Sequence, residues 1–132
     1  MTVVYLDSSA LVKLVVAEPE SSALVKFLRG RSERVSSAVA LAEVPRALRR
    51  AGFGASERRR SREVMARIAL VDVDRRILAA AAALDPPALR TLDAVHLATA
   101  LAVREDLEAL VTYDRRLAAA AESVHLDVSA PS

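Results

Sequence analysis

The stretch Thr91-Leu92-Asp93-Ala94-Val95-His96-Leu97-Ala98-Thr99-Ala100 predicts the start of a helix that continues to about Glu105. Asp93 lies in its first turn, and apolar residues follow. A carboxylate at this position is stabilised by the positive end of the helix dipole, typically by less than ~1 kcal/mol. Capping chemistry of this kind is common, so Asp93 becomes informative only through the other acids that could meet it.

Strand-like and helix-like segments alternate along the rest of the chain. Short apolar or β-branched runs predict strands at 3–6, 34–37, 69–73, 109–112 and 124–128. Amphipathic or capped segments predict helices at 10–16, 20–29, 38–51, 57–66, 75–84, 91–105 and 115–121. Three caps are expected from side chains, with Ser8 or Ser9, Ser56 and Asp74 before the first, fourth and fifth helices. The alternation predicts an α/β sandwich with a mostly parallel sheet.

Length and composition limit the protein class. A chain of 132 residues suggests one domain, 1–132, large enough to bury about two-thirds of its unfolded surface. Hydrophobic residues make up 53% of it, yet no uncharged apolar run reaches the length of a membrane span. The first residues form a strand-like segment and lack the pattern of a signal peptide, so we expect a cytoplasmic protein. With no cysteine, neither disulfides nor thiolate metal sites can form.

The charge is distributed unevenly. The net charge is +2, but the window from Arg46 to Arg67 holds eight arginines and two glutamates. Arginine binds phosphates in a bidentate manner, so a concentrated basic face is typical of nucleic-acid binding. A solvated helix face would look the same, and both interpretations stay open. With two Phe, two Tyr and no Trp, base stacking on an aromatic platform is not expected.

The helix predicted at 38–51 carries a glutamate beside its apolar stripe. Leu41, Val44, Leu48 and Ala51 follow helical spacing, and Glu43 falls at the edge of this stripe. Pro45 lacks an N–H group and clashes with the carbonyl group of residue 41 in a straight helix. We therefore expect a kink or an irregular turn next to Glu43.

Four acids share a suggestive placement. Asp7 and Asp114 follow strands, Asp93 begins a helix and Glu43 lies within one. The carboxyl ends of parallel strands meet at one sheet edge, where sites form in open α/β sheets. Two carboxylates about 4 Å apart repel by roughly 4 kcal/mol at an effective dielectric of about 20, so four that converge need a cation or large pKa shifts. All-oxygen ligation favours Mg²⁺ or Mn²⁺, and metal-assisted phosphodiester hydrolysis follows. The spacing alone leaves open whether Asp7 is only a cap.

Four segments of the chain resemble PIN-domain ribonucleases, in particular VapC-type toxins of toxin–antitoxin modules. Each segment holds one of the four acids, and their order matches that family over nearly the whole chain. The segments are Val4–Leu11, Ser37–Val44, Leu92–Ala98 and Thr112–Leu117.

The resemblance implies a three-layer α/β/α fold and an endoribonuclease that depends on Mg²⁺ or Mn²⁺. It also implies a protein antitoxin that blocks the site, and a homodimer. By this resemblance Asp7, Glu43, Asp93 and Asp114 are the metal ligands, directly or through water, and Asp114 varies most in position within the family. Ser8 or Thr112 could position a metal-bound water or orient a carboxylate. RNA contacts would fall on the arginine-rich face, with Arg46, Arg49 and Arg50 as candidates.

Other interpretations remain. A catalytically silent PIN-like module could bind RNA or a protein partner, although all four acids are present. A signalling domain phosphorylated at Asp7 usually needs a lysine near a late strand, whereas the only lysines are Lys13 and Lys26. His96 is expected to be a packing histidine with one satisfied nitrogen rather than a metal ligand or proton shuttle. Lys13 and Arg90 could reach phosphates, but solvated positions are favoured.

Overall fold

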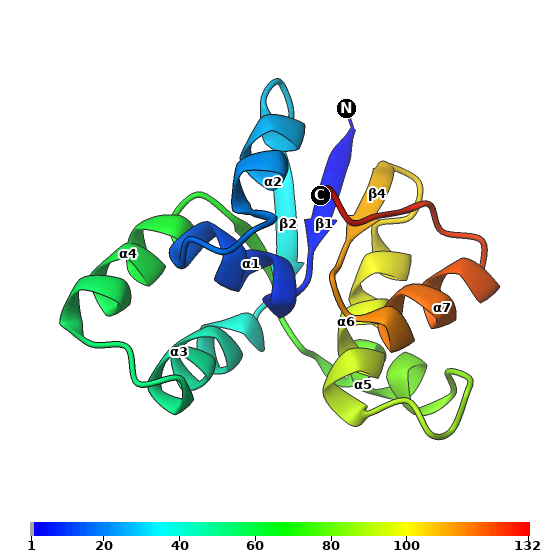
Figure 1. Cartoon of the computed structure of the whole chain (residues 1–132). Helices are drawn as coiled ribbons and strands as arrows, with labels where there is room; N and C mark the ends of the chain where they lie inside the picture. Colours follow the sequence, from blue (N-terminus) through cyan, green and yellow to red (C-terminus); the bar gives the residue numbers. More distant parts are fainter. Residues whose placement is uncertain (1) are drawn as a thin grey trace.

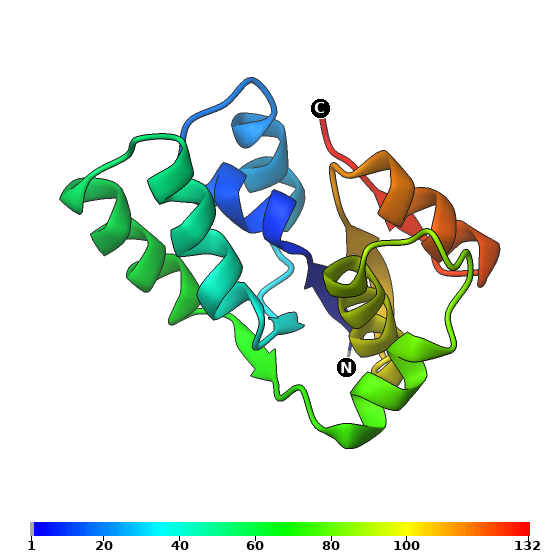
Figure 2. The same cartoon turned by 90° about the horizontal axis from the view of Figure 1, so that it is seen from below.

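The computed structural model describes residues 2–132, which form a parallel sheet covered by helices on both faces (Figures 1 and 2). The strand order is β3-β2-β1-β4-β5, and every pair of neighbours is parallel. The strands are β1 Val3–Leu6, β2 Arg34–Ser37, β3 Ala69–Val71, β4 Leu107–Val111 and β5 Val128–Ser129. The predicted three-layer α/β/α architecture is confirmed.

The helices divide into two groups, α1 to α4 on one side of the sheet and α5 to α7 on the other (Figure 1). Their bounds are α1 Ser8–Val15, α2 Ser21–Leu28, α3 Ala40–Arg50, α4 Ala55–Met65, α5 Arg75–Ala82, α6 Thr91–Ala102 and α7 Arg115–Ser123. None of these helices could span a lipid bilayer, judged by length and hydropathy over residues 2–132.

The central strand β1 serves both cores because successive side chains point to opposite faces. Val4 and Leu6 pack into the core under α1 to α4, whereas Tyr5 packs into the core under α6 and α7. Helix α6 is buried from Asp93 to Ala100, and it contacts α5, α7 and β2. A helix that is apolar nearly all round belongs in an interior, and α6 lies there.

The register of β1 and β4 places the ends of both strands together. Leu6 pairs with Val111, so the next residues, Asp7 and Thr112, leave the sheet side by side. β2 pairs with β1 on its other side and leads through a turn into α3, which carries Glu43. The carboxyl edge of the sheet therefore gathers residues that are far apart in the sequence.

Most predicted element bounds agree with the structure within one to three residues, but some expectations are wrong. The final strand shrinks from 124–128 to Val128–Ser129, because residues before it turn through His125 at a φ of 67°. Helix α4 begins at Ala55 rather than after Ser56, and Gly54 donates its N–H to the Glu57 carboxylate. The first helix is capped by Asp7 itself rather than by Ser8 or Ser9.

Helix α3 also departs from the expectation. Its buried stripe is Ala40, Val44 and Leu48, whereas Leu41 is 56% exposed. No irregular turn interrupts α3 at Pro45, since the helix is continuous from Ala40 to Arg50. Pro45 leaves the Leu41 carbonyl group without its helical donor, and on this exposed side water can replace that donor.

Candidate active site

A pocket of about 630 Å³ opens at the carboxyl edge of the sheet, and all four predicted acids line it. Asp7 comes from the end of β1, Glu43 from α3, Asp93 from the first turn of α6, and Asp114 from the loop after β4. The convergence expected from the sequence is therefore present at the level of the pocket. The way each carboxylate is held differs from one acid to the next.

Asp7 is almost completely buried, with 3% of its surface exposed. Its Oδ1 accepts hydrogen bonds from Ser9 Oγ at 2.6 Å and from the Ala10 backbone N–H at 3.0 Å, and its Oδ2 accepts from Thr112 Oγ1 at 2.6 Å. Burial raises the pKa of Asp7, and these three hydrogen bonds only partly oppose that shift. The chain thus holds a carboxylate whose negative charge lacks a full counter-charge from the protein.

Glu43 is held by a hydroxyl and an imidazole ring on a single oxygen. Its Oε1 accepts from Ser8 Oγ and lies 2.6 Å from both that hydroxyl and His96 Nε2. Burial acts to raise the pKa of Glu43, but the hydrogen bonds from His96 and Ser8 prevail and lower it. The carboxylate is therefore kept ionised.

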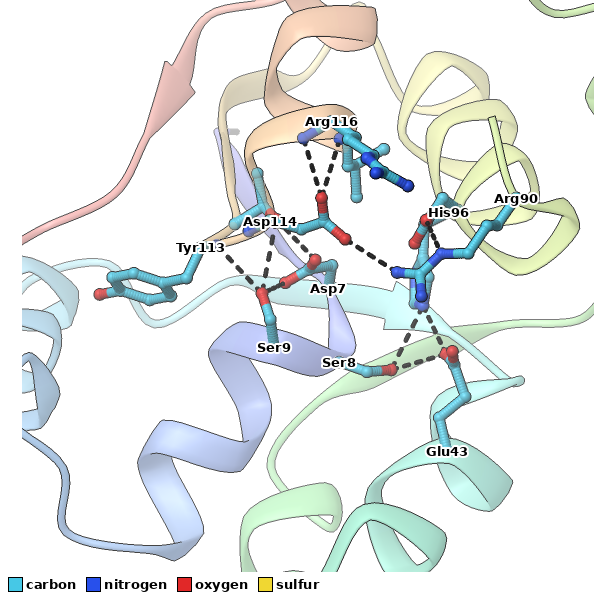
Figure 3. A network of polar contacts seen from close by, with 12 residues as sticks. Asp7, Ser8, Ser9, Glu43, Arg90, His96, Tyr113, Asp114 and Arg116 are labelled. Atoms are coloured by element: carbon cyan, nitrogen blue, oxygen red, sulfur yellow. Dashed lines mark hydrogen bonds and ion pairs between the residues drawn. The ribbon is translucent and has the colours of Figure 1, made fainter. Parts of the chain in front are cut away.

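Arg90 connects the other two acids. Its Nε donates to Asp93 Oδ2 at 3.0 Å, and its Nη2 donates to Asp114 Oδ2 at 3.0 Å (Figure 3). Hydrogen bonding to Asp93 and the charges of both acids raise the pKa of Arg90. Asp114 also caps α7, where its Oδ1 accepts from the N–H groups of Arg116 and Leu117.

The donor set of this pocket fits a hard divalent cation, because it is made of carboxylates and hydroxyls. The geometry fits less directly. Across residues 2–132, no three His, Cys, Asp or Glu side chains are already spaced to hold an ion. Asp93 and Asp114 turn toward Arg90, and Glu43 turns toward His96. Binding a cation here requires Asp93 and Asp114, whose side chains are 12% and 22% exposed, to turn from Arg90 toward the ion.

Both hydroxyl residues predicted to support the site contact an acid. Ser8 donates to Glu43 and Thr112 donates to Asp7. Ser9 was not predicted, although it bonds Asp7 and accepts from the Tyr113 backbone N–H at 3.0 Å. The sequence feature that could have indicated this role of Ser9 is its position two residues after Asp7, at the start of a helix.

His96 and Arg90 are more engaged than the sequence suggested. Both ring nitrogens of His96 have partners, since Nδ1 lies 2.7 Å from the Tyr5 hydroxyl and Nε2 contacts Glu43. His96 is buried as expected of a packing histidine, but the expectation that only one of its nitrogens is satisfied is wrong. Arg90 lies three residues before Asp93, a spacing that brings side chains together at the start of a helix. That spacing could have predicted its ion pair.

The three candidate RNA-binding arginines are all exposed, but they do not lie alike. Arg46 and Arg50 contribute to the wall of the pocket, whereas Arg49 lies on α3 outside that wall. Arg46 and Arg50 are one helical turn apart and thus share a face of the helix. A phosphate near the acids would meet these two arginines first.

Comparison with known proteins places the chain in a family. The family profile "PIN domain" matches residues 4–123. The chain is 52% identical to "Ribonuclease VapC46" of Mycobacterium tuberculosis over 132 residues, which is 100% of both chains. It is 44% identical to "Ribonuclease VapC35" of the same species over 135 residues, covering 97% of this chain and 96% of the relative.

Solved structures share the fold at low sequence identity. The crystal structure of Mycobacterium tuberculosis VapC20, described as a Sarcin-Ricin loop cleaving toxin, matches with a TM-score of 0.69 at 15% identity, covering 89% of this chain and 94% of that one. PAE2754 from Pyrobaculum aerophilum matches with a TM-score of 0.61 at 21% identity, covering 96% and 83%. With the whole-length identity to VapC ribonucleases and the four acids at one sheet edge, the chain belongs to the PIN-domain family, among the VapC-type proteins.

Proposed function

We propose that this protein is an endoribonuclease that depends on Mg²⁺ or Mn²⁺ and acts as the toxin of a toxin–antitoxin pair. One observation carries the proposal: four carboxylates from four separate elements line one pocket at the carboxyl edge of a PIN-domain sheet. Relatives named ribonucleases that match along their whole length support the same activity. The whole chain, 1–132, would act as one PIN-like domain.

In this proposal Asp7, Glu43, Asp93 and Asp114 hold the cation, directly or through water. A bound Mg²⁺ or Mn²⁺ would supply a nucleophilic water and neutralise charge on the scissile phosphate. Thr112 and Ser8 keep Asp7 and Glu43 oriented, because each hydroxyl donates to a carboxylate oxygen at 2.6 Å. Arg46 and Arg50 would bind phosphates of the RNA backbone beside the acids, with Arg49 further out.

The proposed partners follow from the same family. The substrate is RNA in the cytoplasm, a protein antitoxin covers the acidic pocket, and the toxin forms a homodimer. An antitoxin that buries the pocket must satisfy four carboxylates and Arg90. We therefore expect it to bring both polar and charged side chains.

The alternative is a PIN-like module that binds RNA or a protein without cutting. The ion pairs of Arg90 favour this non-cutting module, because they engage Asp93 and Asp114, two of the four acids that would hold a cation. A phosphate-accepting signalling domain has no such support, since Lys13 pairs with Glu18 and Glu20 instead of pointing to Asp7. RNA cleavage in Mn²⁺ would support the ribonuclease, whereas RNA binding without cleavage would support the binding module.

The test uses the purified chain without antitoxin. RNA should be cleaved in Mg²⁺ or Mn²⁺, and EDTA should stop cleavage. Asp93→Asn should reduce the rate on the order of a thousandfold, because several kcal/mol of charge stabilisation are lost. Asp72→Asn is the matched control, since Asp72 is an exposed acid away from the pocket. Cleavage by Asp93→Asn at the normal rate would show that the site is wrongly assigned.

A further inference from the structure

Behind Glu43, two buried side chains form a hydrogen-bonded chain that ends on its carboxylate. The Tyr5 hydroxyl lies 2.7 Å from His96 Nδ1, and His96 Nε2 lies 2.6 Å from Glu43 Oε1. Tyr5 is fully buried and His96 is 2% exposed. The two rings meet edge to face, with centroids 5.9 Å apart and planes at 78°. Strand β1 and helix α6 thus fix both side chains from opposite sides.

The partners determine where the protons lie. A carboxylate oxygen only accepts hydrogen bonds, so His96 Nε2 must carry the hydrogen that it shares with Glu43. In a neutral ring with Nε2 protonated, Nδ1 is an acceptor. The Tyr5 hydroxyl fills that acceptor by donating to it. With a neutral ring the order of donation is therefore Tyr5 to His96 to Glu43, whereas a doubly protonated ring would donate from both nitrogens.

The same arrangement leaves one oxygen of Glu43 available to the pocket. Oε1 takes the hydrogen bonds from His96 and from Ser8, which approach from α6 and α1. Among residues 2–132, no hydrogen bond reaches Oε2. Glu43 is thus fixed through one oxygen, and it lines the pocket together with the other three acids.

We propose that Tyr5 and His96 are positioning residues for the reaction: the Tyr5 hydroxyl locks the His96 tautomer, and His96 holds Glu43 in the orientation that serves the cation. This inference rests on the proposed ribonuclease function, and it goes beyond the acids and hydroxyls already assigned. Partners of metal ligands commonly change affinity or activity by about 10- to 100-fold when they are removed. Partners for both ring nitrogens stabilise any buried histidine, and the contact with the Glu43 carboxylate is what connects this pair to the site.

The tautomer itself is measured by NMR on the ¹⁵N-labelled full chain in EDTA. Long-range ¹H–¹⁵N correlations should show His96 protonated at Nε2 alone, with that proton protected from exchange with water. His125 is exposed and serves as the internal reference, whose ring proton exchanges rapidly. In Tyr5→Phe, the Nδ1 signal should shift because its donor is gone. A proton on Nδ1 in the wild type would overturn the proposal.

Tyr5→Phe then tests the consequence, because it removes one oxygen and keeps the ring. Calorimetry should show Mn²⁺ binding weakened on the order of tenfold, and kcat for RNA should fall while KM stays within about twofold. Tyr113→Phe is the control, since the Tyr113 hydroxyl bonds the Pro131 carbonyl group outside the acidic pocket. Equal Mn²⁺ affinity and kcat in Tyr5→Phe and the wild type would contradict the assignment.

Two substitutions of His96 separate positioning from packing. The side-chain amide of glutamine can donate to Glu43 as His96 Nε2 does, whereas leucine fills similar space without a donor. We expect His96→Gln to retain Mn²⁺ affinity within about tenfold and His96→Leu to lose substantially more. If both variants fold, by circular dichroism, and bind Mn²⁺ equally, His96 only packs.

The two kinds of failure are distinguishable. If the wild type binds Mn²⁺ without cutting any RNA, the proposed function fails, but calorimetry and the tautomer measurement still decide the role of Tyr5 and His96. If the wild type cuts RNA and the His96 tautomer is mixed, the function stands and the positioning role falls.

Discussion

The two halves of the acidic pocket are built in different ways. Asp7 and Glu43 are held by hydroxyl, backbone-amide and imidazole donors, most of them buried, whereas Asp93 and Asp114 are held by Arg90, whose side chain is 68% exposed. A neutral donor orients a carboxylate and leaves its charge in place. A guanidinium neutralises the carboxylate that it orients.

This difference predicts how each half responds to a cation. Breaking a buried hydrogen bond costs about 1–3 kcal/mol, whereas an exposed ion pair is worth about 0–1 kcal/mol. The half around Asp7 and Glu43 is therefore formed in advance. In the other half, the ion pairs with Arg90 can be replaced, so Asp93 and Asp114 can turn from the guanidinium to a metal ion.

The largest expected effect comes from Asp7→Asn. Cleavage should fall on the order of a thousandfold, through loss of a buried charge that serves the cation. Stability in EDTA should rise, with a melting temperature higher by about 2–4 °C. The sign follows from the raised pKa of Asp7, because an acid whose pKa is raised in the fold is more stable protonated than ionised.

That variant also removes a pH dependence. In the wild type, Asp7 makes the fold less stable as pH rises from the ordinary value of 3.8 through its raised pKa. Glu43 acts with the opposite sign, since its lowered pKa stabilises the fold above 4.5 and that contribution is lost as pH falls. Melting curves from pH 3 to 8 check both signs. A lower melting temperature for Asp7→Asn at pH 7 would contradict the predicted cost of burying the charge.

The next effect tests a neutral donor. Thr112→Val removes the hydroxyl that donates to Asp7 and should raise the pKa of Asp7 further. Cleavage should fall by about 10- to 100-fold and the free energy of unfolding by about 1–3 kcal/mol. Thr112→Ser keeps the hydroxyl and should retain most of both quantities. Ribonuclease rates and urea unfolding measure the two quantities. Equal losses of rate and of stability in Thr112→Val and Thr112→Ser would assign the effect to packing.

A smaller effect is expected for the ion pairs of Arg90 with Asp93 and Asp114. Arg90→Ala removes the cation that competes for Asp93 and Asp114, so Mg²⁺ should bind about tenfold more tightly by calorimetry. Arg46→Ala is the control, because Arg46 lines the same pocket without an ion pair to these acids. The same gain in both variants would indicate a general charge effect rather than competition.

The smallest effect concerns the basic wall beside the acids. Arg46→Ala and Arg50→Ala should each weaken RNA binding by about 2- to 10-fold and lower the slope of log K against log[salt] by about 1. Arg49→Ala, which changes a residue outside the pocket wall, should have less effect on both. Filter binding in EDTA at several salt concentrations measures this without cleavage, and an equal loss for Arg49→Ala would extend the RNA path along α3.

The sequence predicted the features that depend on periodicity and strand ends. Alternating strands and helices predicted the layers, and parallel strands predicted that Asp7 and Asp114 share one edge. It could not predict the long-range contacts of His96, because His96 bonds Tyr5 and Glu43, which lie 91 and 53 positions away. The exposed position of Leu41 was missed for a related reason, since a few apolar residues fit more than one helical stripe.

The burial of α6 has a further consequence for how the protein is controlled. This helix carries Asp93 and His96 and packs in the interior along most of its length. Local unfolding draws on segments with few buried contacts, and α6 is the opposite. Its amides should therefore exchange with deuterium only when the whole domain unfolds. Unfolding this wall of the pocket would cost the fold most of its stability, so we expect an inhibitor to act by occupying the pocket and not by unfolding α6.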